Sequence, residues 1–364
     1  MSLKCRHRLC VRILLSSFFA ALILGFGSMA AESGSDNPLN PALPDPSEEF
    51  VEICLNVLRE QYPELGDFLS NEVPSSYKLY GLSGTRSIYA RGEKKGEIGL
   101  CMDMTPQGLV ATEEYILVSA YSKSHDFHSV LWVIDRKTGD YIKTVVLEGV
   151  DHVGGIAYDD TFHIVWVTCT NGKGHAGAVG CLKLEEIEKY DLDRRGKVLR
   201  YDHKYNLGGI DRTSFLTVDS GYMLSGVFRD KEPGTLCVYK LNPGGYPETE
   251  DVESESETYP EVKPIATVAI PDEIQGITLD DDLLVLSQSY GNKDSWLVIY
   301  PKPEMDEMED MTDDDAGELI KAPPYLEQIF LDNYHLFTLF ESAASAYRDR
   351  KNVLCIDHVL EFDV

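Results

Sequence analysis

Basic residues, long apolar runs and common catalytic motifs are all scarce in this sequence. Its 364 residues include 33 Lys and Arg against 61 Asp and Glu, which gives a formal net charge of −28. A surface of this charge repels nucleic acid and anionic lipid, so we expect neither as a partner. The chain has no Gly-x-Ser-x-Gly, His-Glu-x-x-His or Cys-x-x-Cys sequence. The usual signatures of serine hydrolases, zinc proteases and small zinc or redox sites are therefore missing.

One long apolar run is present, and it lies in the first thirty residues. Basic residues precede the run at 13–27, and the small-x-small sequence Ser28-Met29-Ala30 follows it. This order is typical of a signal peptide, so we expect residues 1–30 to be removed and the protein to be secreted, either extracellular or in the cell envelope. The alternative, a permanent membrane anchor, requires a longer span. After processing we expect no membrane association.

The residues that follow the signal predict a linker and then one helix. Residues 31–45 are rich in Pro, Asn and Ser, which favours a flexible linker. Asp45 suits the N-cap of a helix, Pro46 its first turn, and Glu48 the position of a capping-box carboxylate. Apolar residues then recur at helical spacing: Phe50, Val51, Cys54, Leu55 and Leu58. We expect a helical segment over 46–75 whose apolar face packs against the side or bottom of the main domain, with a lid or partner-binding role as the alternative.

The rest of the chain, residues 76–364, repeats one pattern five times. A glycine turn or polar pair leads into an apolar run at the equivalent positions Gly108, Gly155, Phe215, Gly276 and Gln328, spaced 47, 60, 61 and 52 residues apart. Each unit contains two or more β-branched and aromatic runs around a polar turn. This period is typical of propeller blades, and the sequence predicts an all-β, five-bladed β-propeller with an N-terminal helical segment. A β-sandwich with coincidental spacing is the alternative.

The fifth unit ends at Val364 one strand short of a complete sheet. Strand-like pieces between Tyr77 and Gly99 belong to no unit of their own. We therefore expect this N-terminal piece to supply the missing outer strand of the last blade. Closure of the ring in this way removes exposed sheet edges.

Cysteines and acidic runs each leave two interpretations open. Six cysteines remain after processing, at positions 54, 101, 169, 181, 237 and 355, and they permit three disulfides or six small buried side chains. The acidic runs at 247–262 and 304–318 follow an apparent third strand, which favours solvated insertions at the outer rim over calcium sites.

Propeller geometry predicts where a ligand would bind. The residue before each innermost strand lies at the same mouth of the central channel as the residue after each second strand. This rule selects a polar set with aromatic walls, which is typical of a small-molecule pocket: Gln107, Tyr121, His152, Arg212, Gln275, Tyr290, Glu327 and Glu341. We expect His128 and Arg348, seven residues past Tyr121 and Glu341, to reach the same rim. Glu341 follows an apolar run, so we expect its carboxylate in a partly dry site, paired with Arg348.

The stretch from about residue 100 to the end resembles the secreted, lactonase-like and YncE-like β-propellers. The resemblance rests on SVLWVIDRKTGDYIKTVVL at 129–147 and HVGGIAYD at 152–159. It implies the architecture rather than a reaction. In the gluconolactonase-like branch a channel Glu, Asn and Asp hold a divalent metal, whereas this rim offers Gln107, Gln275 and Glu327, too few carboxylates to predict a metal site.

A weaker resemblance is to the plant- and bacterial-type glutaminyl cyclases, which are five-bladed propellers. The segment 106–147 is similar to their opening blade, in which Gln-Gly leads into a strand that ends in Glu-Ser-Thr. Here Ser119-Ala120-Tyr121 stands at that strand end, and the Glu-Ser pair occurs in the last unit, at Glu341-Ser342.

Together these observations predict a secreted propeller that acts as a binding or scaffold module, with its ligand at one mouth of the channel. A lactonase-like small-molecule hydrolase or a glutaminyl cyclase-like transferase is the alternative. The expected partner is a small molecule, a peptide or an extracellular protein. The sequence requires no cofactor, although a divalent metal stays open.

Overall fold

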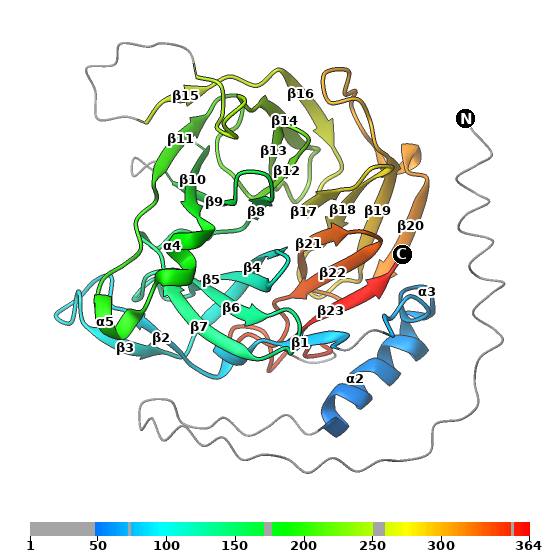
Figure 1. Ribbon diagram of the computed structural model, residues 1–364. Coiled ribbons are helices and arrows are strands. Elements are labelled where there is room, and N and C mark those ends of the chain that lie inside the picture. The colour runs from blue at the N-terminus through cyan, green and yellow to red at the C-terminus, as the bar shows by residue number, and fades with distance from the viewer. Residues whose placement is uncertain (1–47, 72–73, 171–176, 250–258, 351–352) are drawn as a thin grey trace. The chain divides into compact units, whose positions relative to one another are not determined.

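The computed structural model describes residues 48–71, 74–170, 177–249, 259–350 and 353–364. Within them, five sheets surround a common centre (Figure 1). The expected signal and linker, residues 1–45, and the cap residues Asp45 and Pro46 lie outside the described residues. Among the described helices, none is long and apolar enough to cross a membrane.

Each sheet is built from consecutive antiparallel strands, innermost strand first. The first blade contains β4 (Met104–Ala111), β5 (Tyr115–Ser122), β6 (Val130–Asp135) and β7 (Tyr141–Val146). The second contains β8 (Ile156–Asp159), β9 (Ile164–Thr170), β10 (Gly177–Lys183) and β11 (His203–Leu207), with the short β15 (Glu261–Val262) added in parallel at its outer edge. The third contains β12 (Phe215–Asp219), β13 (Tyr222–Val227), β14 (Gly234–Lys240) and β16 (Ala266–Ile270). The fourth contains β17 (Ile274–Leu279), β18 (Leu283–Gln288), β19 (Ser295–Pro301) and β20 (Glu318–Ala322).

The fifth blade joins the two ends of the described chain. It contains β21 (Leu326–Asp332), β22 (His335–Phe340), β23 (His358–Asp363) and β1 (Ser76–Lys78). Strand β1 pairs antiparallel with β23, with Tyr77 opposite Val359. The expected closure by an N-terminal strand is therefore confirmed. The later strand-like piece behaves differently, because β2 (Thr85–Ile88) and β3 (Ile98–Cys101) form a separate two-stranded sheet.

The five innermost strands form a closed ring: β4 lies against β8, β8 against β12, β12 against β17, β17 against β21, and β21 against β4. The fold is thus a five-bladed β-propeller, as the repeat predicts. All five equivalent positions identified in the sequence lie on or next to these innermost strands. The repeat follows from this geometry, since every blade needs one buried strand at the centre.

The side chain of Gln328 fills the centre of the ring. Its Oε1 accepts hydrogen bonds from the backbone N–H groups of Leu109 (3.2 Å) and Ile156 (2.8 Å). Its Nε2 donates to the carbonyl oxygens of Ile156 (2.6 Å) and Leu216 (3.1 Å). One amide from the fifth blade therefore ties the first three blades together. Gly276 makes room for this residue, because a Cβ there would lie 2.7 Å from the Cα of Gln328.

The N-terminal helix packs on the outside of the propeller. Helix α2 (Glu48–Gln61) and the short α3 (Pro63–Gly66) place Cys54, Leu58 and Leu65 in a core with apolar side chains of the fourth and fifth blades. The Tyr62 hydroxyl donates to Asp294 (2.9 Å). The side chains of Phe50 and Val51 lie outside the described residues. These contacts agree with the expected packing on the propeller's side.

The remaining helices are short and lie in loops: η2 (Tyr80–Ser83), α4 (Leu184–Lys189), α5 (Leu192–Arg195) and η3 (Asp313–Asp315). The acidic run at 304–318 connects the third and fourth strands of its blade, as expected, but it is not fully solvated, since Met305 and Met308 are buried in it. Part of the other run, 250–258, lies outside the described residues. The six cysteines at 54, 101, 169, 181, 237 and 355 are all free thiols, and all but Cys355 are buried. Burial, the alternative to disulfides, is what the structure shows.

Candidate functional site

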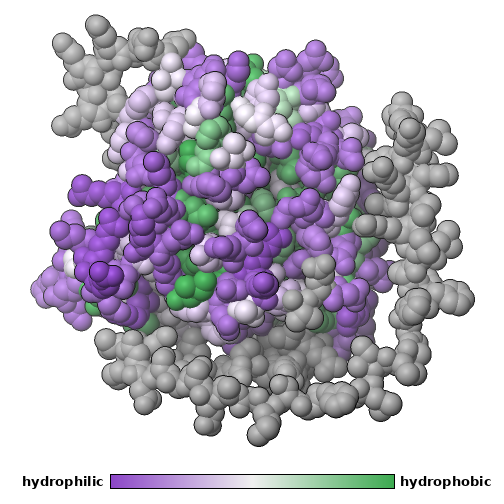
Figure 2. All heavy atoms as spheres, in the orientation of Figure 1, coloured by the Kyte–Doolittle hydropathy of each residue, from purple (hydrophilic) through white to green (hydrophobic). Residues whose placement is uncertain are grey.

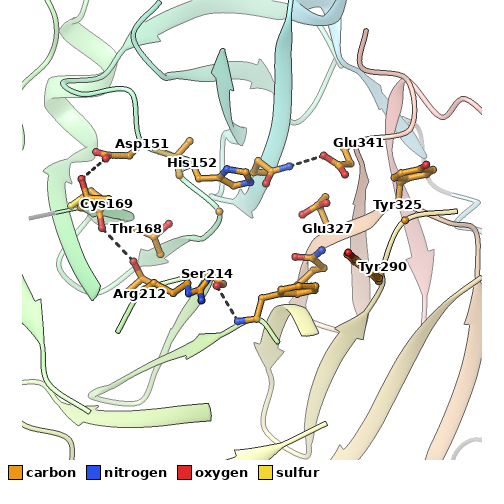
Figure 3. Close-up of a pocket in the computed structure, with 18 of the residues that line it drawn as sticks. Asp151, His152, Thr168, Cys169, Arg212, Ser214, Tyr290, Tyr325, Glu327 and Glu341 are labelled. Carbon is orange, nitrogen blue, oxygen red and sulfur yellow. Dashed lines mark hydrogen bonds between the residues drawn. The ribbon is translucent and has the colours of Figure 1, made fainter. Parts of the chain in front are cut away.

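A pocket of about 640 Å³ opens at one mouth of the channel. Figure 2 shows a mostly hydrophilic face in the orientation of Figure 1, with apolar side chains between the polar ones towards its centre. Seven residues selected from the sequence line the pocket: Gln107, His152, Arg212, Gln275, Tyr290, Glu327 and Glu341 (Figure 3). The geometric rule that selected them therefore brings most of the set together.

Irregularities in the innermost strands direct several of these side chains to the mouth. The pairing of β4 with β5 shifts register between Pro106 and Gly108, so that Gln107 is the extra residue. Equivalent shifts occur at Gln275 in β17 and at Glu327 and Gln328 in β21. Bulges bend a strand and re-aim its side chains, and they are frequent next to active sites. In the first, fourth and fifth blades a polar residue of the inner strand, Gln107, Gln275 or Glu327, thus lies in a bulge.

Two carboxyl groups meet at the bottom of the pocket. Glu327 lies in β21 and Glu341 follows β22, so both belong to the fifth blade, and they are only 4% and 9% exposed. Their carboxyl groups interact, and the negative charge of Glu341 raises the pKa of Glu327. Two carboxyl groups coupled in this way cannot both ionise readily, so Glu341 ionises first and Glu327 keeps its proton to higher pH.

Burial is the main reason why the pKa values of both carboxyl groups are raised. Burial raises the pKa of Glu341 to about 7, against the smaller, opposing effects of Lys123 and of hydrogen bonds from neighbouring groups. Burial and the negative charge of Glu341 raise the pKa of Glu327 well above its usual range. We refer to Glu327 and Glu341 below as the carboxyl pair.

Groups from three directions hold the carboxyl pair in place. Gln107 Nε2, from the first blade, donates to Glu341 Oε2 (3.0 Å), and the dashed line that ends at Glu341 in Figure 3 marks this contact. Tyr347 is a further hydrogen-bond partner of Glu341. The Lys123 ammonium donates to the hydroxyl oxygens of Tyr121 (2.9 Å) and Tyr347 (3.1 Å). A cation thus lies near the pair without forming a direct ion pair with it.

The wall next to the carboxyl pair is aromatic. The rings of Tyr121 and His152 stack with their centroids 4.1 Å apart, and Tyr325 packs against Tyr347 at 4.9 Å. Burial lowers the pKa of His152 to about 4, so this imidazole is neutral at pH 7. His152 therefore contributes a flat, uncharged surface at neutral pH.

Three of the predicted positions differ from expectation. His128 is outside the pocket, because its Nδ1 is held by the carbonyl oxygen of Gly149 (2.9 Å) in a loop beside β2. Arg348 is exposed and also outside the pocket, and in the described structure Glu341 is hydrogen-bonded to Gln107 rather than ion-paired with Arg348. The expected ion pair is wrong. Tyr121 lies behind the pocket wall, where it is 2% exposed and supports His152.

The strand rule also covers the lining residues Asp211 and Phe228, but it misses four other charged or aromatic ones: Asp151, Tyr325, Tyr347 and Arg350. Asp151 and Tyr325 lie one or two residues from positions that the strand rule does select. Tyr325 has a positive φ of 66°, as does Val153, with 48°, at the equivalent start of the second blade. Left-handed backbone is unfavourable for such residues and frequently occurs at functional sites.

The acid–base groups of the pocket are clearer than any nucleophile. Burial raises the pKa of the Cys169 thiol, so it stays protonated at neutral pH and is a poor nucleophile. Burial also raises the pKa of Asp151, whose carboxyl group accepts a hydrogen bond from Thr170 (2.6 Å). In the part of the chain that the structure describes, no group of three or more His, Cys, Asp or Glu side chains is placed to hold a metal ion. What the arrangement can do is transfer protons.

Comparisons with known proteins extend to the fold alone. No known family of sequences matches this chain, and no curated protein does. Solved propellers with similar structures include the glutaminyl cyclase of Myxococcus xanthus (TM-score 0.42, 10% identity, 71% of this chain and 90% of that one). Another is a putative oxidoreductase (glucose dehydrogenase) from Thermus thermophilus (TM-score 0.40, 15% identity, 76% and 85%). At such low identity these likenesses carry no argument about activity.

Proposed function

We propose that this protein is a hydrolase that uses acid–base catalysis on a small amide, ester or lactone at the mouth of the propeller. The observation that carries the proposal is the carboxyl pair, in which two buried groups at the bottom of an open pocket hold one proton between them. Such a pair supplies a base and an acid at the same time. Two buried carboxyl groups are rarely kept in contact for a structural purpose alone, because burying two groups of like charge costs free energy.

In the proposed reaction one carboxyl group acts as the base and the other as the acid. The ionised carboxylate accepts a proton from a water molecule while the water oxygen attacks the carbonyl carbon. The protonated carboxyl gives its proton to the carbonyl oxygen, so that a tetrahedral intermediate forms. The bond to the leaving nitrogen or oxygen then breaks, and the leaving group takes up the proton that came from water. One hydroxyl of the intermediate returns its proton to the carboxylate that had donated one, so a carboxylic acid is released and the pair again holds one proton. Gln107 keeps Glu341 in position during these steps through its amide N–H.

The test is a hydrolysis screen with variants of the pair. The wild-type protein is assayed against a panel of small amides, esters and lactones, alongside Glu327→Gln, Glu341→Gln and the exposed-site control Glu114→Gln. We expect turnover by the wild type and the control, and at least a hundredfold loss in either variant of the pair. Binding without turnover would instead favour the binding-module interpretation, and turnover that survives both substitutions would refute the proposal.

We also propose that the protein acts after export. The proposal rests on the basic residues, the apolar run and the Ser28-Met29-Ala30 sequence near the N-terminus. Intact-mass measurement of protein recovered from the medium or envelope should show a chain that begins at or near Ala31. A mature chain that retains residues 13–27 would contradict it.

A further inference from the structure

One cation at the mouth stands apart from the others. Arg212 precedes the third blade and lies across the pocket from the carboxyl pair in Figure 3. Its side chain is 61% exposed, and its contact with Asp211 is long, with Nε 3.7 Å from Oδ1. Among the residues that the structure describes, the Arg212 side chain donates no hydrogen bond. It therefore keeps a fork of donors available for a ligand.

The other charged groups that line the pocket already have partners. Asp211 has both carboxylate oxygens 3.2 Å from Nη2 of Arg229. Asp151 accepts a hydrogen bond from Thr170. Arg350 donates to the Tyr325 hydroxyl (2.9 Å). Each of these groups is thus engaged by at least one partner within the protein, whereas the Arg212 guanidinium has no hydrogen bond in the described structure and is the cation most available to a charge on the ligand.

We infer that the substrate carries a carboxylate, which Arg212 binds while the carboxyl pair acts on the substrate's carbonyl group. This inference rests on the proposed function and names its substrate class: a small anionic amide, ester or lactone. A guanidinium matches a carboxylate with two parallel N–H donors, which fixes orientation as well as distance. A molecule whose carboxylate is bound by Arg212 presents its uncharged end to the carboxyl pair on the opposite side of the pocket.

The size and charge of the pocket fit this class. A cavity of about 640 Å³ is in the range typical of small-molecule sites. The carboxyl pair holds one proton, so it repels an anion less than two ionised carboxylates would. A substrate with a negative charge close to its carbonyl group would be held away from the pair, whereas a charge separated by a short spacer reaches Arg212.

The experiment uses two probes of similar size that differ in charge: succinic acid mono-4-nitroanilide, and 4-oxopentanoic acid 4-nitroanilide, in which a methyl ketone replaces the carboxylate. Both are assayed for binding by calorimetry and for release of 4-nitroaniline. The proteins are the wild type, Arg212→Met, Arg212→Lys and a control, Arg194→Met, in the exposed helix α5. Binding is also measured in Glu341→Gln, so that affinity is read without turnover. Since Arg212 is exposed, its variants should fold.

We expect the charged probe to bind at least tenfold more tightly than the ketone, and Arg212→Met to remove this preference. Arg212→Lys should restore part of it, and Arg194→Met should change nothing. Hydrolysis that is equal for the two probes, or that does not depend on Arg212, would overturn the inference and leave the hydrolase proposal standing. Binding that depends on Arg212 but never leads to turnover would overturn the hydrolase proposal and keep the anion site. Failure of both probes to bind would overturn both.

Discussion

Glu327 and Gln328 are neighbours in β21, and both are buried, yet they have opposite effects on the stability of the fold. The amide of Gln328 makes four hydrogen bonds to backbone groups of three other blades, so its burial stabilises the ring. The carboxyl group of Glu327 meets another carboxyl group instead, which destabilises the fold whenever both ionise. The difference shows that one bulge places a stabilising amide and a destabilising carboxyl group on adjacent residues. Under the proposed function, the first residue serves the fold and the second the reaction.

Removal of the Gln328 side chain from the centre of the ring should have the largest effect on stability. Gln328→Ala leaves four backbone groups without their partner and opens a cavity at the centre of the ring. We expect a loss of about 3–5 kcal/mol in the free energy of unfolding, measured by urea denaturation. The exposed-site control Glu114→Ala should change it by less than about 0.5 kcal/mol. A loss below about 1 kcal/mol in Gln328→Ala would show that the amide is not the tie between blades.

The neighbouring substitution should have the opposite sign. Because the folded-state pKa of Glu327 is raised, its protonated form favours folding at low pH, and this stability is lost as pH rises through the folded-state value. Glu327→Gln removes the titrating group. We expect the variant to be more stable than the wild type by about 1–3 kcal/mol at pH 8, and to be inactive. Parallel stability profiles of the two proteins between pH 5 and 9 would contradict this.

His152 should limit stability on the acid side. Its pKa is lowered to about 4 by burial, so the neutral form favours folding above the unfolded value of 6.5, and that stability is lost as pH falls from 6.5 towards 4. His152→Phe keeps the stack on Tyr121 and removes the proton. We expect a gain of about 1–2 kcal/mol over the wild type at pH 4.5, from melting curves, with little change at pH 7.5. A wild type that melts at the same temperature at both pH values would argue against the buried neutral imidazole.

Lys123 should have the smallest effect, seen only in titration. Its positive charge lowers the pKa of both members of the carboxyl pair, so Lys123→Met should move their titration to higher pH. The measurement is the pH at which the infrared band of a protonated carboxyl disappears. Lys293→Met, at the Tyr290 side of the mouth, is the control and should leave that pH unchanged. An unchanged value in Lys123→Met would mean that the cation is screened from the pair.

Much of the fold was predictable because a propeller repeats one local pattern. Glycines mark the innermost strand in three blades, at positions 108, 155 and 276, and a Cβ at Gly108 would lie 2.4 Å from Ser119 Oγ. The strand rule then places Gln107, Gln275 and Glu327 at one mouth, where the inner strands of three blades are bulged. These features depend on residues that are close together in the sequence, so they could be predicted from it.

The remaining details depend on contacts that sequence spacing does not report. After β22 the chain makes a series of turns, with Ala344 N–H donating to the Glu341 carbonyl and Tyr347 N–H to that of Ala344. These turns bring Tyr347 to the pocket and leave its neighbour Arg348 outside, and no periodicity distinguishes the two. The carboxyl pair itself joins residues 14 positions apart that meet only across a strand pairing. Contacts of this kind become visible in the folded chain.

The central claim is that Glu327 and Glu341 share one proton at neutral pH, and infrared spectroscopy tests it most directly. The difference spectrum between the wild type and Glu327→Gln at pH 7 should contain the carbonyl band of a protonated carboxyl. That band should shift in D₂O and should also be altered in Glu341→Gln. A difference spectrum that contains only bands of ionised carboxylate would contradict the account, because the pair would then carry two charges and no proton to donate.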